Sequence, residues 1–157
     1  MNRELIQRVH IRAELEATDK PTTLRELLGV LIDGGGVDAK DRDSILESLE
    51  ERERKGSTGI GNGFAVPHVK ADVTERPEIV LARSVDGLDY AAVDGRPVHV
   101  FFLIVSPVAQ ADQHLEVLRW VSTLARNADF RRFALAASDA DSLRDLLVEM
   151  LGEGSAP

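Results

Sequence analysis

The segment Val98–Val105, VHVFFLIV, restricts the possible folds of this chain more than any other feature. Apart from His99, its side chains are apolar at odd and even positions alike, so a strand built from it is hydrophobic on both faces. Such strands lie inside sheets whose two faces are both covered. The segment is also far too short to cross a membrane as a helix. It therefore predicts a central strand in a covered sheet.

Strand-like and helical patterns alternate around this segment. A period-two pattern predicts a strand over Val9–Leu15, and a second strand is predicted over Glu78–Val85. Apolar residues at helical spacing predict five helices. Three of them have an expected cap: Thr22 or Thr23 before a helix over Leu24–Ile32, Asp38 before a helix to Leu49, and Ser138 before a helix to Met150. The other two are a long helix over Gln110–Arg126 and a shorter one that begins at Asp129. The pattern predicts one α/β domain over residues 1–152, followed by a frayed tail over 153–157.

The composition argues against several classes of function. With 19 Lys and Arg against 27 Asp and Glu, the net charge is −8, and an acidic surface disfavours nucleic acid as a partner. The absence of cysteine excludes disulfides, thiolate chemistry and cysteine metal sites. The N-terminus MNRELIQRVH lacks the apolar region of a secretory signal. We therefore expect a cytoplasmic protein without membrane insertion.

The stretch GSTGIGNGFAVPHVK, residues 56–70, is dense in glycine and ends on a histidine behind a proline. It fits neither a Walker A loop nor a dinucleotide fingerprint, and the histidines of the chain lack zinc-site spacing, so we expect no metal. Pro67 ends strand pairing and presents His68 on a stiff backbone, while the glycines allow N–H groups to converge on an anion. The stretch is compatible with phosphoryl chemistry on His68 and also with a tight hairpin bearing an ordinary surface histidine.

Residues 51–68, ERERKGSTGIGNGFAVPH, resemble the signature of phosphotransferase-system enzyme IIA domains of the fructose/mannitol type, including the nitrogen-regulatory branch. The resemblance continues through Asp94–Val98, His114-Leu115 and Asp129–Arg131, and covers the chain from about Val9 to Leu147. Together with the alternating pattern, it implies a three-layer α/β/α domain with a mixed β-sheet.

The resemblance implies that His68 accepts a phosphoryl group on Nε2 (tele) from HPr or its nitrogen-branch homologue, without a cofactor. The chain would pass the group to an enzyme IIB or hold it as a signal to a regulated target. A neutral imidazole has the lone pair that such an attack requires. Positioned N–H donors and a cation then matter more than a strong base.

The family also places a second histidine near the acceptor, and His114 matches it. In a helix, His114 shares a face with Leu118 and Val121, so it points the same way as the apolar stripe. Its place near the helix start disfavours an imidazolium, because the positive end of the helix dipole lies there. We therefore expect a neutral His114 that contacts His68 or the phosphoryl oxygens.

Arg52 matches the arginine of the family motif, which implies a bidentate contact with phosphate. The alternative is that the mixed charges of residues 50–55 pair with one another at a solvated helix end. Ser57, Gly61 and Asn62 are further candidates for phosphate binding. Their alternative role is to form the turn itself.

Three other residues near these motifs carry weaker expectations. His10 is expected to be exposed on the polar face of the first strand. His99 stands where the family more often carries an acidic residue, which argues against a functional role for it. Val69 is bulkier than the small residue expected after the Pro-His pair, and we expect it to narrow the approach to His68.

Two functions remain open on the sequence. One is a transport carrier that serves an enzyme IIB in fructose/mannitol-type sugar uptake. The other is a nitrogen-regulatory-type signalling protein. The sequence GSTGIGNG and the lack of an attached IIB or membrane segment favour this second function. In both cases we expect the donor to dock on an apolar patch around residues 59–68, with Ile60 or Phe64 pointing outward.

Overall fold

The computed structural model describes the backbone of residues 1–154 and the side chains of residues 1–151. Its strands form one mixed sheet in the order β1-β5-β6-β3-β2, with β4 also paired to β6. The elements in chain order are α1 (Arg3–Gln7), β1 (His10–Arg12), α2 (Lys20–Asp33), η1 (Ala39–Asp41), α3 (Arg42–Arg54), β2 (Gly59–Gly61), β3 (Phe64–Ala65), β4 (His68–Lys70), β5 (Glu78–Leu88), β6 (Val98–Ser106), η2 (Val108–Gln110), α4 (Ala111–Arg126), α5 (Ala128–Ala136) and α6 (Ala140–Gly154).

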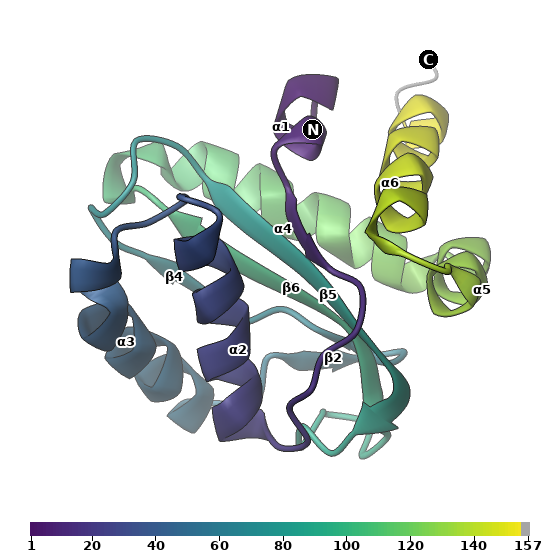
Figure 1. Ribbon diagram of the computed structural model, residues 1–157, viewed down its shortest axis with the longest axis horizontal. Coiled ribbons are helices and arrows are strands. Elements are labelled where there is room, and N and C mark those ends of the chain that lie inside the picture. The colour runs from purple at the N-terminus through teal and green to yellow at the C-terminus, as the bar shows by residue number, and fades with distance from the viewer. Residues whose placement is uncertain (155–157) are drawn as a thin grey trace.

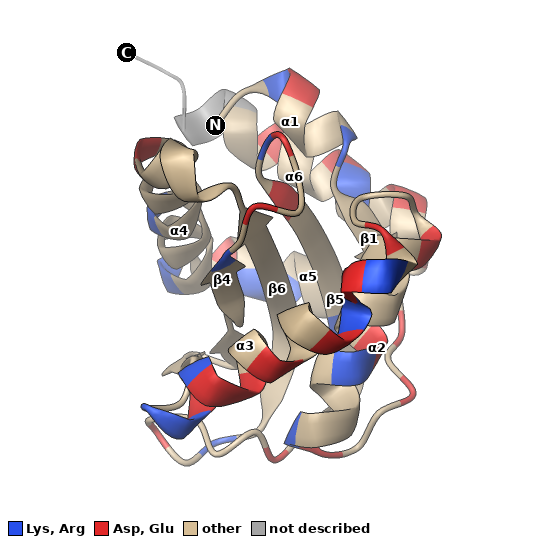
Figure 2. Cartoon of the chain, turned by 90° about the vertical axis from the view of Figure 1, so that its left-hand side faces the viewer, with Lys and Arg blue, Asp and Glu red and all other residues tan. Residues whose placement is uncertain are grey.

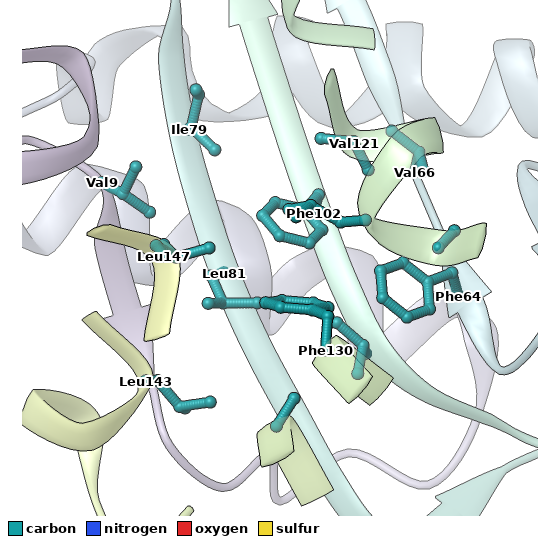
Figure 3. Close-up of a cluster of buried hydrophobic side chains, with 14 of the residues drawn as sticks. Val9, Phe64, Val66, Ile79, Leu81, Phe102, Val121, Phe130, Leu143 and Leu147 are labelled. Atoms are coloured by element: carbon teal, nitrogen blue, oxygen red, sulfur yellow. The ribbon is translucent and has the colours of Figure 1, made fainter. Parts of the chain in front are cut away.

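Helices cover both faces of this sheet, which gives the predicted three layers. In Figure 1, α2 and α3 lie in front of the strands and α4 lies behind them. One core packs α1, α4, α5 and α6 against the sheet; Figure 3 shows part of it around Phe102 and Phe130. The other core packs α2 and α3 against the opposite face through residues such as Leu28 and Leu49. The predicted single α/β domain with a mixed sheet is confirmed.

Strand β6 is the centre of the sheet, as its sequence predicts. Every residue of β6 is buried except the half-buried His99. Alternate side chains enter different cores: Phe102 and Ile104 face α4, whereas Phe101 and Leu103 face α2 and α3. Figure 2 shows β6 free of charge while charged residues gather on α2 and α3. The prediction of a strand covered on both faces is confirmed.

Strands β3 and β4 run parallel to β6 in one continuous register. Phe64 lies opposite Val100 and His68 lies opposite Ile104. Between them, the carbonyl of Pro67 accepts a hydrogen bond from the Ile104 amide at 3.0 Å. The sequence predicted that His68 would follow a strand end; instead it begins β4, on the same line of pairing as β3.

The predicted element boundaries need several corrections. Helix α2 is capped by Asp19, not by Thr22 or Thr23, because the Asp19 carboxylate accepts from the Thr22 amide at 2.9 Å. Helix α6 is likewise capped by Asp139 instead of Ser138.

The first predicted strand is short, because only His10–Arg12 pairs with β5, and α1 was not predicted. Asp38 caps the short helix η1 rather than α3. The predicted tail over 153–157 begins inside α6, and residues 155–157 lie outside the described residues. Over the part of the chain that is described, no helix is long and apolar enough to cross a membrane.

Candidate functional site

His68 has one ring nitrogen tied to the main chain. Its Nδ1 lies 2.7 Å from the carbonyl oxygen of Val66. A carbonyl oxygen only accepts hydrogen bonds, so Nδ1 carries the hydrogen of the neutral ring. Nε2 therefore keeps its lone pair. The local sequence favours this geometry, because Pro67, the one residue between acceptor and donor, stiffens the backbone.

His114 lies beside His68, as expected. The two ring centroids are 5.5 Å apart and the rings are inclined by 50°. His114 belongs to the first turn of α4 and is only 6% exposed, with Nδ1 2.7 Å from the hydroxyl oxygen of Ser106. The prediction that His114 points with the apolar stripe of its helix is confirmed.

Burial keeps both imidazoles neutral. It lowers the pKa of His114 from 6.5 to about 4, with smaller contributions from His68 and Lys70. Burial also lowers the pKa of His68, against the opposing effect of the hydrogen bond to Val66. Two neutral imidazoles near neutral pH leave a nucleophilic nitrogen available on His68.

Arg52 lies near His68, at the end of α3. Its guanidinium donates to the carbonyl of Gly56 at 2.9 Å, and its charge contributes to the lowered pKa of His68. The alternative of mutual pairing is not observed, since no ion pair joins two of residues 50–55 within the described part of the chain. A phosphate contact by Arg52 stays a prediction.

A buried carboxylate next to Arg52 anchors the glycine-rich loop, and sequence reasoning missed it. The side chain of Glu53 is 5% exposed, and its carboxylate lies 2.9 Å from the ammonium group of Lys20 and 2.9 Å from the hydroxyl of Tyr90. It also accepts from the amide and the hydroxyl of Thr58. The carbonyl of Thr58 in turn accepts from the Val66 amide at 2.9 Å. Glu53 thereby links α3 to the backbone that carries His68.

The structure does not bring Gly61 and Asn62 to His68. Both have positive φ, 97° and 57°, and form the turn between β2 and β3, where the Asn62 amide donates to Asp94. Phe64 after this turn lies opposite Val100, four residues before the partner of His68, which corresponds to about 13 Å along the sheet. Turn formation, the alternative role, accounts for these two residues.

Ser57 lies at the other end of β2. Its hydroxyl accepts from the amide of Gly59 at 3.0 Å, which is again turn chemistry. A Cβ on Gly59 would lie 2.7 Å from the Cα of Ala92, so this glycine allows two backbone segments to approach closely. The glycines of this stretch therefore allow the backbone to turn and to pack closely against a neighbouring segment.

Lys70 is a cation near both histidines that sequence reasoning missed. It follows His68 by two residues on β4, so both side chains leave the strand on one face. Lys70 lies opposite Ser106, the partner of His114, and its charge contributes to the lowered pKa of both histidines. The period-two rule applied to His68 would have identified it.

Three weaker expectations have clear outcomes. His10 is half-buried rather than exposed, with Nε2 3.4 Å from Glu78. Val69 is buried among the residues that face α2 and α3, so it does not narrow the approach to His68. The Nδ1 of His99 lies 3.0 Å from the Ser84 carbonyl on β5, which gives His99 a structural role.

Of the two apolar candidates for a docking patch, only one points outward. Ile60 is 41% exposed, whereas Phe64 is fully buried and packs against Phe102 and Phe130. Within residues 1–151, no group of three or more His, Asp or Glu side chains is arranged to hold a metal ion.

The fold is that of the crystal structure of Nitrogen Regulatory Protein IIA-Ntr from Neisseria meningitidis. The TM-score is 0.79 at 25% sequence identity, over 92% of this chain and 99% of that one. This likeness shows that the two chains share a fold. A family model described as "Phosphoenolpyruvate-dependent sugar phosphotransferase system, EIIA 2" matches residues 4–150, and the chain belongs to this family.

Relatives come from both functional branches of the family. The chain is 35% identical over 143 residues to the PTS system fructose-specific EIIA component of Haloferax volcanii. This alignment covers 88% of this chain and 92% of that protein. It is 34% identical over 110 residues to a nitrogen regulatory protein of Pseudomonas aeruginosa, over 70% of this chain and 71% of that protein. The chain is thus an EIIA phosphotransferase component of one branch or the other.

Proposed function

We propose that Nε2 of His68 accepts a phosphoryl group in the cytoplasm from phosphorylated HPr or its nitrogen-branch homologue. The observation that carries this proposal is the 2.7 Å hydrogen bond from Nδ1 of His68 to the Val66 carbonyl. It commits one ring nitrogen to the main chain and leaves the lone pair on the other. Burial supports the same role, because it keeps the ring neutral.

The transfer needs no proton to move between residues. The donor's phosphohistidine carries a hydrogen on its other ring nitrogen. The bond from phosphorus to the donor's histidine breaks as the bond from phosphorus to Nε2 of His68 forms, so the donor ring leaves as a neutral imidazole. The ring of His68 keeps its Nδ1 hydrogen and gains positive charge. The Val66 carbonyl stabilises that charge through the existing hydrogen bond.

The groups around His68 supply the positioning and the charge that phosphoryl transfer requires. Arg52 and Lys70 are cations near the ring, and His114 is a neutral partner beside it. We expect these three to interact with the phosphoryl oxygens, whose charge they would neutralise.

Radiolabelled phosphoenolpyruvate, the general phosphotransferase enzyme and HPr test this assignment. The wild-type chain should acquire an acid-labile, base-stable label, and His68→Ala should acquire none. His10→Gln is the matched control, because His10 lies in β1 near Glu78, away from the proposed site. Full labelling of His68→Ala would refute the role of His68.

We further propose that the carrier acts mainly as a nitrogen-regulatory-type signal. The sequence of residues 56–63 and the similarity to nitrogen regulatory proteins support this role. The specific alternative is transport, in which His68 passes the group to an enzyme IIB. It is supported by the similarity to the fructose-specific component, which is 35% identical over 88% of this chain.

A transfer assay separates the two roles. The phosphorylated chain is mixed with a purified fructose-type enzyme IIB, and loss of label from the chain is followed. A regulator should keep its label and bind a target protein differently in its two states. Rapid and complete transfer to the enzyme IIB would instead favour transport.

A further inference from the structure

Ser106 is a buried hydroxyl group next to His114. It ends β6 and is 0% exposed, and its Oγ lies 2.7 Å from Nδ1 of His114. The Ser106 carbonyl accepts from the Ala71 amide at 2.8 Å, and Ser106 pairs with Lys70 on β4. The strand therefore fixes the hydroxyl in place relative to the first turn of α4.

The position of one hydrogen decides which nitrogen of His114 is protonated. Among the described residues, Nδ1 of His114 is the sole hydrogen-bond partner of the Ser106 hydroxyl. If Nδ1 donated to that oxygen, the buried hydroxyl hydrogen would have no acceptor, which proteins avoid. If the hydroxyl donates to Nδ1, both groups are satisfied. The neutral ring of His114 must then carry its hydrogen on Nε2.

The two histidines thus take opposite tautomers. His68 has its hydrogen on Nδ1, directed to the Val66 carbonyl, and a lone pair on Nε2. His114 accepts at Nδ1 and has an N–H at Nε2. With ring centroids 5.5 Å apart, a nucleophilic nitrogen and a neutral N–H donor occupy the same site. A donor of this kind stabilises charge on phosphoryl oxygens.

The geometry points to Ser106 as a positioning residue that holds His114 with its hydrogen on Nε2, so that His114 donates a hydrogen bond to the phosphoryl group on His68. This inference rests on the proposed function of His68. Ser106 itself forms no bond to phosphorus. Its contribution is to exclude the tautomer in which His114 would turn a lone pair toward the anionic phosphoryl oxygens.

Long-range ¹H–¹⁵N correlation spectra of the labelled full chain at neutral pH test the tautomers directly. Each ring is assigned by the loss of its signals in the corresponding His→Gln variant. We expect His114 to show an unprotonated Nδ1 and a protonated Nε2, and His68 to show the reverse. A protonated Nδ1 on His114 overturns the inference without the need for any variant.

Variants of Ser106 then test the link to transfer. In Ser106→Ala, the Nδ1 signal of His114 should move, because that nitrogen loses its donor, and labelling of His68 should slow by about tenfold. Ser106→Thr keeps the hydroxyl and should restore both properties. Ser84→Ala removes a buried hydroxyl that accepts from the Gly87 amide on β5, and should change neither.

Failure of this inference can be told apart from failure of the proposed function. An unmoved Nδ1 signal with unchanged labelling in Ser106→Ala refutes only the role of Ser106. A wild-type chain that takes no label on His68 refutes the carrier role, and with it the phosphoryl contact of His114.

Discussion

The imidazole rings of His68 and His114 lie 5.5 Å apart between centroids, one on β4 and the other in the first turn of α4. His114 is buried and His68 is half-buried, and the pKa of each is lowered mainly by that burial. A positive charge on either ring would also disfavour a charge on the other. The pair is therefore neutral together over a wider pH range than free histidine allows.

We expect labelling of His68 to decline with a midpoint below pH 6.5, the pKa of an unperturbed histidine, because burial lowers the pKa of His68. Stability should follow the same direction. The folded pKa of His114 is about 4 against 6.5 when unfolded, so the unfolded chain binds more protons between these values and stability is lost as the pH falls through that window. NMR titration of the ring signals measures the two pKa values, and urea unfolding at each pH measures the stability. A midpoint for either ring at or above 6.5 would contradict this prediction.

Lys70→Gln should slow phosphoryl transfer to His68 by about threefold to tenfold, because it removes a cation from the side of the sheet where the phosphoryl group would lie. The fold should be unaffected, since Lys70 is exposed. Initial labelling rates measure the effect, with Lys40→Gln as control because that exposed lysine lies in η1. Equal rates for both variants would remove Lys70 from the site.

Glu53→Gln should destabilise the protein by about 2 kcal/mol, because Lys20 loses its ion-pair partner and the amide cannot accept from Thr58 and Tyr90 as the carboxylate does. Chemical unfolding measures the loss. Glu51→Gln, an exposed position on the same helix, should change stability by less than about 0.5 kcal/mol. If the two variants unfold alike, the Glu53 cluster is not a stabilising anchor.

Ile60→Asp should weaken docking of the phosphorylated donor at any salt concentration without a change in stability, since Ile60 is an exposed apolar residue on β2. Added salt should slow transfer mainly through association. Leu135→Asp is the matched control, with 39% exposure against 41%, and it lies in α5. Chemical-shift mapping that finds donor contacts away from residues 59–68 would refute this docking surface.

Phe64→Ala does not test docking, contrary to what the sequence suggested. The side chain is fully buried between Phe102 and Phe130, so its removal should cost about 3–5 kcal/mol of stability. Chemical unfolding would report that loss, and any effect on transfer would follow from it. A stability change below about 1 kcal/mol would contradict the packing around Phe64.

The layered architecture was predictable because it follows from local patterns. An uninterrupted apolar strand needs cover on both faces, and amphipathic helices supply that cover. The helix caps were less predictable, because Asp19 and Thr22 are both good capping residues and only the backbone geometry selects one. The short β1 depended on pairing with β5, which no local signal encodes.

The candidate site was predictable where residues are adjacent in sequence. Pro67 and His68 form one rigid unit, and the helical spacing of His114 placed it on a buried face. Ser106 and Glu53 were missed because their partners lie on other elements. Gly61 and Asn62 were assigned to phosphate because a glycine-rich string does not show which end of its hairpin lies near the histidine.

The continuous register of β3 and β4 along β6 makes the spacing between Phe64 and His68 as important as the residues themselves. A strand presents successive side chains to opposite faces, so removal of one residue from this interval would move His68 to the position of Pro67 and Val69 to that of His68. The imidazole would then be buried against α2 and α3, and an isopropyl group would face His114. A chain that kept the other motif residues but lacked one residue between Phe64 and His68 would therefore have its nucleophile on the wrong side of the sheet.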